Sequence, residues 1–182
     1  MRLMIKKYCI LFFLLFGSCG NKKESCQNNY INDTGICYKI IEHRITHDKL
    51  NILTNTILKR TSYYLNIDSS IIYKRFLNNK INLIVAPKEN IPSLRNKKDS
   101  ILGITSMVYY KYDNLISEIN IGVRNDLKCF SYTYMHELLH VIYNVLYTST
   151  AIKYGNNYHD ELYFGLGNNS LEDKLYNEIG CF

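Results

Sequence analysis

The five residues His136-Glu137-Leu138-Leu139-His140 constrain this chain more than any other segment, because they place metal-binding side chains within a helical pattern. Two histidines four positions apart project from the same side of an α-helix, which completes one turn in about 3.6 residues. Their ring nitrogens can therefore hold one zinc ion. Glu137 follows the first histidine directly, and from there its carboxylate can take a proton from a water molecule at the metal.

The segment from Ser131 to Tyr147 has the pattern of a helix with one apolar side. Its apolar residues recur at spacings of three and four: Met135, Leu138, Leu139, Ile142, Val145 and Leu146. Ser131 or Thr133 is the expected N-cap. The two histidines lie on the remaining side, which would face a cleft. The alternative is an ordinary amphipathic helix whose histidines are only polar surface residues.

A zinc site that activates water needs a third protein ligand and one open position. The next histidine along the chain is His159, shortly after a turn signal at residues 155–157. We expect His159 to be the third ligand, with Asp160 or Glu161 orienting a ligating histidine through its carboxylate. Asp160 and Glu161 also remain alternatives for the third ligand, and His159 could be an ordinary loop histidine.

Tyrosines are frequent around these residues. A phenol hydroxyl near the metal could stabilise the oxyanion that forms during amide hydrolysis. Tyr163 and Tyr158 are the candidates for this role, although a packing aromatic is the more common role for each.

The H-E-x-x-H motif at residues 136–140 resembles that of the zincin metallopeptidases, and the resemblance covers about the last third of the chain. The metzincin extension is absent, because Tyr143 and Leu146 stand where its glycine and third histidine would be. The distance from His140 to Glu161 is similar to that in gluzincins, whose second motif is not clearly present here. Residues 159–164 look similar to the third-ligand region of SprT-like and related minimal peptidases, which favours His159.

The rest of the chain predicts a small mixed sheet and several helices. Residues 47–65 and 69–77 have helical spacing, and residues 81–86 read as a buried strand. Residues 101–112 and 115–123 predict a β-hairpin, in which residues 104–110 would be an edge strand able to bind an extended peptide. This order resembles the minimal zincin layout, an α+β fold with a small mixed sheet beside the motif helix.

The first 18 residues have the features of a signal peptide: a basic start, a short apolar run and small residues before Cys19. The end of this segment looks like a bacterial lipobox, which implies cleavage before Cys19 and lipidation of that cysteine. Residues 19–30 would then form a lipid-anchored tether, and residues 31–182 the folded domain. Ordinary secretion with cleavage nearby is the alternative.

The charge of the chain does not indicate a nucleic-acid partner. The whole chain has 22 basic and 16 acidic residues, a net charge of +6. Three basic residues and no acidic ones lie in residues 1–18, so the remaining 164 or so residues carry +3, which is ordinary for one compact domain. We expect a monomer without a nucleic-acid partner.

Four cysteines remain beyond the signal segment and Cys19. In an exported domain, four cysteines predict two disulfides. The preferred pairing is Cys26 with Cys37 and Cys129 with Cys181. A cysteine-based metal site and free buried thiols are the alternatives, although no C-x-x-C spacing supports the first.

Together these patterns predict an exported, lipid-anchored zinc metallopeptidase that faces the periplasm or the cell exterior. One zinc ion per chain would be bound by His136, His140 and His159, with Glu137 as the general base. The substrate would be a peptide or protein, and endopeptidase and exopeptidase action both remain open. The alternatives are a non-catalytic zinc-binding lipoprotein that acts as a binding or adhesion module, and a structural lipoprotein without metal.

Overall fold

The computed structural model describes residues 30–31, 34–41, 45–98, 100–110, 114–123, 130–147, 159–165 and 169–181. The expected signal peptide, the lipidation candidate Cys19 and the tether up to residue 29 lie outside these ranges. Tyr30, expected at the end of the tether, belongs to the first strand. Within the described ranges, no helix has the length and apolar character needed to cross a membrane.

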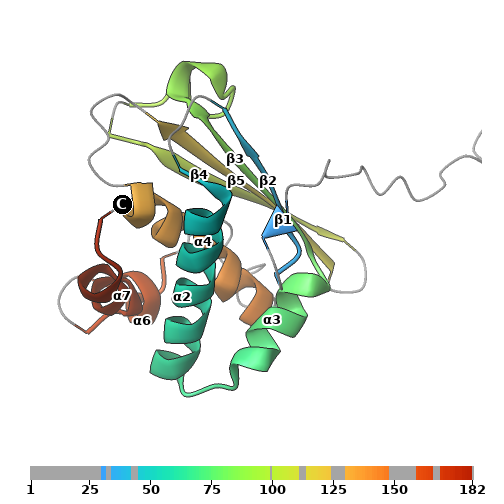
Figure 1. Cartoon of the computed structure of the whole chain (residues 1–182), viewed down its shortest axis with the longest axis vertical. Helices are drawn as coiled ribbons and strands as arrows, with labels where there is room; N and C mark the ends of the chain where they lie inside the picture. The colour runs from blue at the N-terminus through green and yellow to red at the C-terminus, as the bar shows by residue number, and fades with distance from the viewer. Residues whose placement is uncertain are drawn as a thin grey trace, which may run out of the picture.

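The strands form one mixed sheet: β1 (Tyr30–Ile31), β2 (Ile36–Ile40), β3 (Lys80–Pro87), β4 (Gly103–Tyr110) and β5 (Asn114–Val123). Their spatial order is β1-β2-β3-β5-β4 (Figure 1). Strands β2, β3 and β5 run parallel, whereas β1 and β4 are antiparallel to their neighbours. The predicted hairpin is therefore confirmed as β4 and β5, and the predicted edge strand is confirmed because β4 stands at one end of the sheet.

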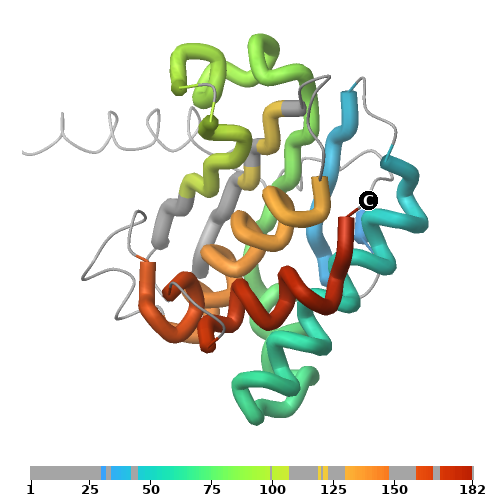
Figure 2. Tube along the Cα trace, turned by 90° about the vertical axis from the view of Figure 1, so that its left-hand side faces the viewer, coloured from blue at the N-terminus to red at the C-terminus, as the bar shows by residue number. Residues whose placement is uncertain are grey.

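The helices are α2 (His47–Leu65), α3 (Ser69–Leu77), α4 (Phe130–Leu146), α6 (Glu161–Phe164) and α7 (Leu171–Ile179), with a short 3₁₀ turn, η1 (Lys88–Asn90). The α-helices gather on one side of the sheet (Figures 1 and 2). Helices α2 and α3 have the predicted bounds, and side chains cap both of them: Thr46 accepts from the backbone N–H of Lys49, and Asp68 from that of Ser70. The expected α+β fold is confirmed.

The hydrophobic core lies between the sheet and these helices. On β3, Ile81, Leu83 and Val85 are buried while the residues between them are only partly covered. A strand's side chains alternate between its two faces, so this pattern means that helices cover one face of the sheet. Helix α4 completes the core with Leu138 and Leu139, both fully buried.

The start of α4 differs from the prediction. The helix begins at Phe130, so Ser131 and Thr133 lie inside it and neither is its N-cap. The Ser131 hydroxyl instead donates a hydrogen bond of 2.7 Å to the carbonyl of Gly180, just beyond α7. A short hydroxyl side chain inside a helix can serve a tertiary contact, which local sequence does not reveal.

The disulfide prediction is tested at two of its four cysteines. Cys37 in β2 and Cys181 after α7 are both disulfide-bonded. Cys26 and Cys129, their expected partners, lie outside the described residues.

Replacing Tyr134 with Phe should lower the free energy of unfolding by about 1 kcal/mol, because the fully buried Tyr134 hydroxyl hydrogen-bonds the Thr54 hydroxyl at 2.8 Å. Chemical denaturation would measure the change. The same substitution at Tyr63, which is 72% exposed, should have almost no effect. Equal losses at the two positions would show that the buried hydrogen bond does not stabilise the fold.

Candidate metal centre

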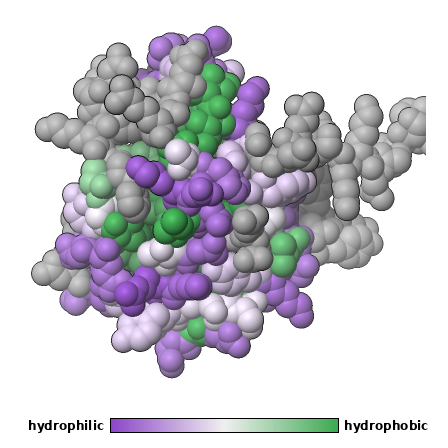
Figure 3. Space-filling view, in the orientation of Figure 1, coloured by the Kyte–Doolittle hydropathy of each residue, from purple (hydrophilic) through white to green (hydrophobic). Residues whose placement is uncertain are grey.

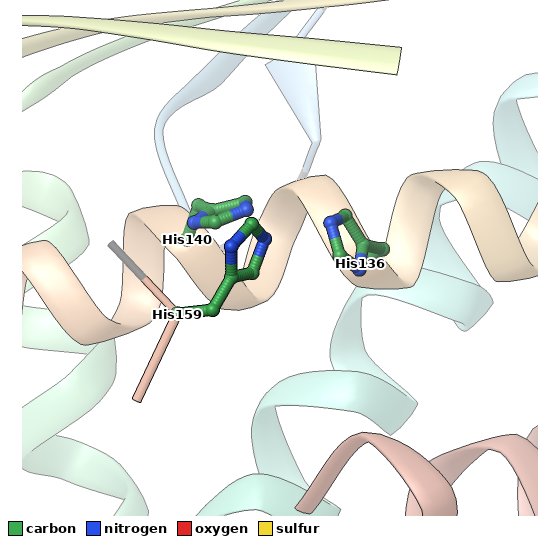
Figure 4. A group of neighbouring side chains, drawn as sticks. All are labelled: His136, His140 and His159. Carbon is green, nitrogen blue, oxygen red and sulfur yellow. The ribbon is translucent and has the colours of Figure 1, made fainter. Parts of the chain in front are cut away.

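Three histidines come together at one side of α4. His136 and His140 come from α4, and His159 lies just before α6, in the chain segment that crosses the helix (Figure 4). One ring nitrogen of each histidine lies within 4.8 Å of those of the other two. These three residues can therefore hold one metal ion, as the sequence predicted.

Helix α6 holds His159 in place although it is only four residues long. The Asp160 carboxylate caps it by accepting a hydrogen bond of 2.9 Å from the backbone N–H of Leu162. At its other end, the ring of Phe164 stacks on His140 with 4.5 Å between ring centroids and meets His159 edge-on at 4.9 Å. Phe164 thus forms an apolar wall behind the histidines, a role that the sequence did not indicate.

The carboxylate that orients a histidine is Glu172, which sequence reasoning did not identify. Its Oε1 lies 2.6 Å from Nδ1 of His136, and both side chains are about 30% exposed. This contact leaves Nε2 of His136 as the free nitrogen. Asp160 is engaged as a helix cap, and Glu161 is exposed on α6, so neither of the expected carboxylates takes this position.

Only a weak sequence signal pointed to Glu172. Ser170 caps α7 by accepting from the backbone N–H of Asp173, and that capping pattern places Glu172 in the first helical turn. Nothing local connects it to a histidine 36 positions earlier. Only the packing of α7 against α4 brings the two side chains together.

The surroundings affect the two histidines of α4 in opposite ways. Burial, together with the neighbouring His136 and His159, lowers the pKa of His140 to about 3. At neutral pH, His140 is therefore uncharged. For His136, burial opposes the charged form, but the adjacent Glu172 outweighs it and raises the pKa. A metal ion at this site would compete with a proton mainly at His136.

Glu137 is buried against the edge strand β4. The Thr105 hydroxyl donates to Oε2 of Glu137 at 2.6 Å and lies 3.2 Å from the backbone carbonyl of the same residue. Gly103 leaves the space that the carboxylate occupies, because a Cβ there would stand 2.4 Å from Oε1. Burial raises the pKa of Glu137, while the bond from Thr105 acts in the opposite direction.

A cavity of about 360 Å³ opens in front of these groups. Its lining combines the histidines and Glu137 with residues of β4 and of the segment before it: Lys97, Ile101, Gly103, Ile104, Thr105, His136, Glu137, His140 and His159. A second hollow lies beyond His159, over α6 and the start of α7. His159 lines both spaces, so a ligand could extend past it from one into the other.

Tyr163, the candidate oxyanion stabiliser, is placed in the core, with only 1% of its surface exposed. Its ring meets that of Tyr143 edge-on at 5.1 Å, and it is not among the residues that line the cavity. Burial, with a further contribution from Tyr147, raises the pKa of its phenol. Tyr158, the other candidate, lies outside the described residues.

The chain matches no known family model, no curated protein and no solved structure. The chemistry of the site therefore has to follow from its own residues. Three imidazoles can bind a metal, and a buried carboxylate held beside the same cavity can exchange protons.

Replacing Glu172 with Gln should weaken metal binding about tenfold or more, because the amide removes the negative charge that orients and polarises His136. Zinc titration against a competing chelator would measure this affinity. The matched control is Glu161→Gln, the same change at an exposed position on α6, which should leave the affinity unchanged. The opposite ranking of the two variants would make Glu161 the functional carboxylate.

Proposed function

We propose that the protein is a zinc-dependent metallopeptidase that hydrolyses peptide bonds. One observation supports this most directly: the carboxylate of Glu137 and the rings of three histidines line the same cavity. A site that only binds a metal needs no more than its ligands and the groups that orient them. A buried carboxylate fixed beside those ligands, but outside the group of three, is what proton transfer requires.

The donor set fits zinc. Three neutral imidazoles with one open position are a ligand set that hydrolytic zinc sites use, and His140 is neutral at any physiological pH. His136, His140 and His159 would hold the ion, and Glu172 would fix the tautomer of His136. When bound, zinc would supply Lewis acidity, lowering the pKa of a water molecule and polarising the scissile carbonyl.

Glu137 would move the proton. Its Oε2 is engaged by the Thr105 hydroxyl, which leaves Oε1, on the Gly103 side, to accept a proton from the attacking water. The same carboxyl group would then pass the proton to the nitrogen of the leaving amine. Burial supports the first of these steps, because a pKa above the ordinary glutamate value makes the carboxylate a stronger base.

The edge strand β4 would bind the substrate. No second neighbour pairs with β4 in the described part of the sheet, and its first residues line the cavity. An extended peptide could pair with this free edge through its backbone, which would bring one amide bond up to Glu137. Tyr163 is too deeply buried to contact such a peptide, so it would take no part in the reaction.

The protein would act outside the cytoplasm. The signal segment in residues 1–18 and the lipidation candidate Cys19 support export and anchoring to a bacterial membrane by lipid. The disulfide bonds of Cys37 and Cys181 agree with an oxidising compartment. Peptides or proteins at the cell surface or in the periplasm would be the substrates.

Replacing Glu137 with Gln should reduce peptide hydrolysis by a factor of about 10² or more, because the amide cannot accept the proton from water. Zinc content should stay at about one ion per chain, since Glu137 is not among the three ligands. Cleavage assays and metal analysis on the same samples would measure both. The control is the same change at the exposed Glu89. Retained hydrolysis in Glu137→Gln would refute the proposed mechanism, and zinc without any hydrolysis in the unmodified protein would favour a binding module.

Replacing Thr105 with Val should shift the acidic side of the pH profile of kcat/KM to higher pH. The Thr105 bond stabilises the charged form of Glu137 and lowers its pKa, so its loss raises that pKa. Glu137 acts as a base only when deprotonated, so the variant would lose activity at a higher pH as the pH falls. Thr105→Ser keeps the hydroxyl and should restore the profile. An identical profile in the Val variant would show that Thr105 does not tune the base.

A further inference from the structure

The segment from Ile91 to Lys98 forms part of the cavity wall and is built as a fixed structure. Backbone hydrogen bonds close successive turns along it, including one of 2.9 Å from the N–H of Lys97 to the carbonyl of Leu94. Ile91 and Leu94 are buried in a small cluster with Ala86, and Ile104, which lines the cavity, packs against that cluster. This wall is therefore attached to the edge strand that carries the rest of the site.

A buried lysine fixes the end of this segment. Lys88 is only 7% exposed, and its Nζ donates to the carbonyls of Lys97 at 3.1 Å and Lys98 at 2.7 Å. Gly122 makes room for it, because a Cβ there would stand 2.9 Å from Cβ of Lys88. An ammonium is buried only where hydrogen bonds compensate for lost water, so Lys88 holds these two carbonyls at defined positions. The backbone of Lys97 is thereby fixed at the cavity.

Lys97 gives one part of the cavity a positive charge. Apart from the histidines, it is the one basic residue among the described residues that line the cavity, and Glu137, engaged by Thr105, is the one acidic residue. The apolar side chains of Ile101 and Ile104 line the same cavity. The segment follows η1, the green coil at the top of Figure 1, and in Figure 3 the hydrophilic side chains at the tip of that end adjoin a hydrophobic patch. A substrate group with an apolar stem and a carboxylate at its end would suit these surroundings.

We infer that Lys97 makes the site selective for substrates that carry a carboxylate close to the cleaved bond. The carboxylate could be an acidic side chain or the free C-terminus of a peptide. This inference rests on the proposed peptidase function and names its substrate class. A pair between a lysine at the rim and a carboxylate remains partly exposed to water, so the expected preference is modest, about twofold to fivefold, and decreases with added salt.

The test compares peptides that share a central apolar pair and differ in one charge. Glu, Gln or Lys is placed in turn at each of three positions on either side of that pair in end-capped peptides, and a second set compares free with amidated C-termini. The full-length protein is measured in two ways. The first is kcat/KM for the unmodified protein, and the second is peptide affinity for zinc-loaded Glu137→Gln, which does not depend on cleavage.

Lys97→Glu is the informative variant, and Lys98→Glu is its matched control. Both make the same change in charge on exposed neighbouring residues, and Lys88 holds the backbone carbonyl of each, but only Lys97 lines the cavity. We expect Lys97→Glu to lose the preference for carboxylate over amide and to favour the lysine-containing peptides instead. In Lys98→Glu, the preference for carboxylate over amide should persist. If the end-capped peptides show this change, the recognised group is a side-chain carboxylate; if the peptides with free or amidated ends show it, the group is a free C-terminus.

Three results would overturn the inference: no charge preference in either measurement, a preference that both variants alter equally, or no binding of any peptide. Cleavage of all peptides at equal rates would leave the peptidase proposal standing while refuting selectivity by Lys97. Conversely, a Lys97-dependent binding preference without any cleavage would refute the peptidase proposal and leave Lys97 as a recognition residue. The two proposals therefore fail in distinguishable ways.

Discussion

The packing of α4 against the sheet is the contact on which the candidate site depends. The helix buries most of its length, including Leu138, Leu139 and Ile142, so its rotation about its own axis is fixed by the core. With that rotation set, Glu137 faces the edge strand β4, while His136 and His140 face the segment that carries His159. The same helix therefore supplies the core and side chains of the candidate site, and a change in its packing would move both.

Each functional side chain on α4 is held by a partner from a different part of the chain. Thr105 of β4 binds Glu137, Glu172 of α7 binds His136, and Phe164 of α6 stacks on His140. Ordering such side chains costs conformational entropy, which these contacts and the surrounding packing offset before any metal arrives. The site is therefore preorganised, and a bound metal ion would add to a geometry that the protein already maintains.

The groups around the cavity differ in charge according to where they lie. Burial keeps His140 neutral, a carboxylate supports His136, and Glu137 has a raised pKa on the β4 side. Lys97 then places a positive charge at the wall, on a backbone that the buried Lys88 fixes from behind. Under the proposed function, the part of the site nearest the histidines would perform the hydrolysis, and the segment before β4 would select the substrate.

The sequence by itself determined several elements and the three candidate histidines, because these depend on local periodicity and spacing: helices α2 and α3, the hairpin and the H-E-x-x-H pair were all predictable within a few residues. Strands β1 and β2 were not predicted. Only the tertiary structure decided which groups support the candidate site. Glu172 lies 36 positions from the histidine it contacts, and Thr105 lies 32 positions from Glu137. Tyr163 lies in the core, and Asp160 caps a helix. A contact between distant segments leaves no periodic trace in the sequence, since it depends on how whole elements pack.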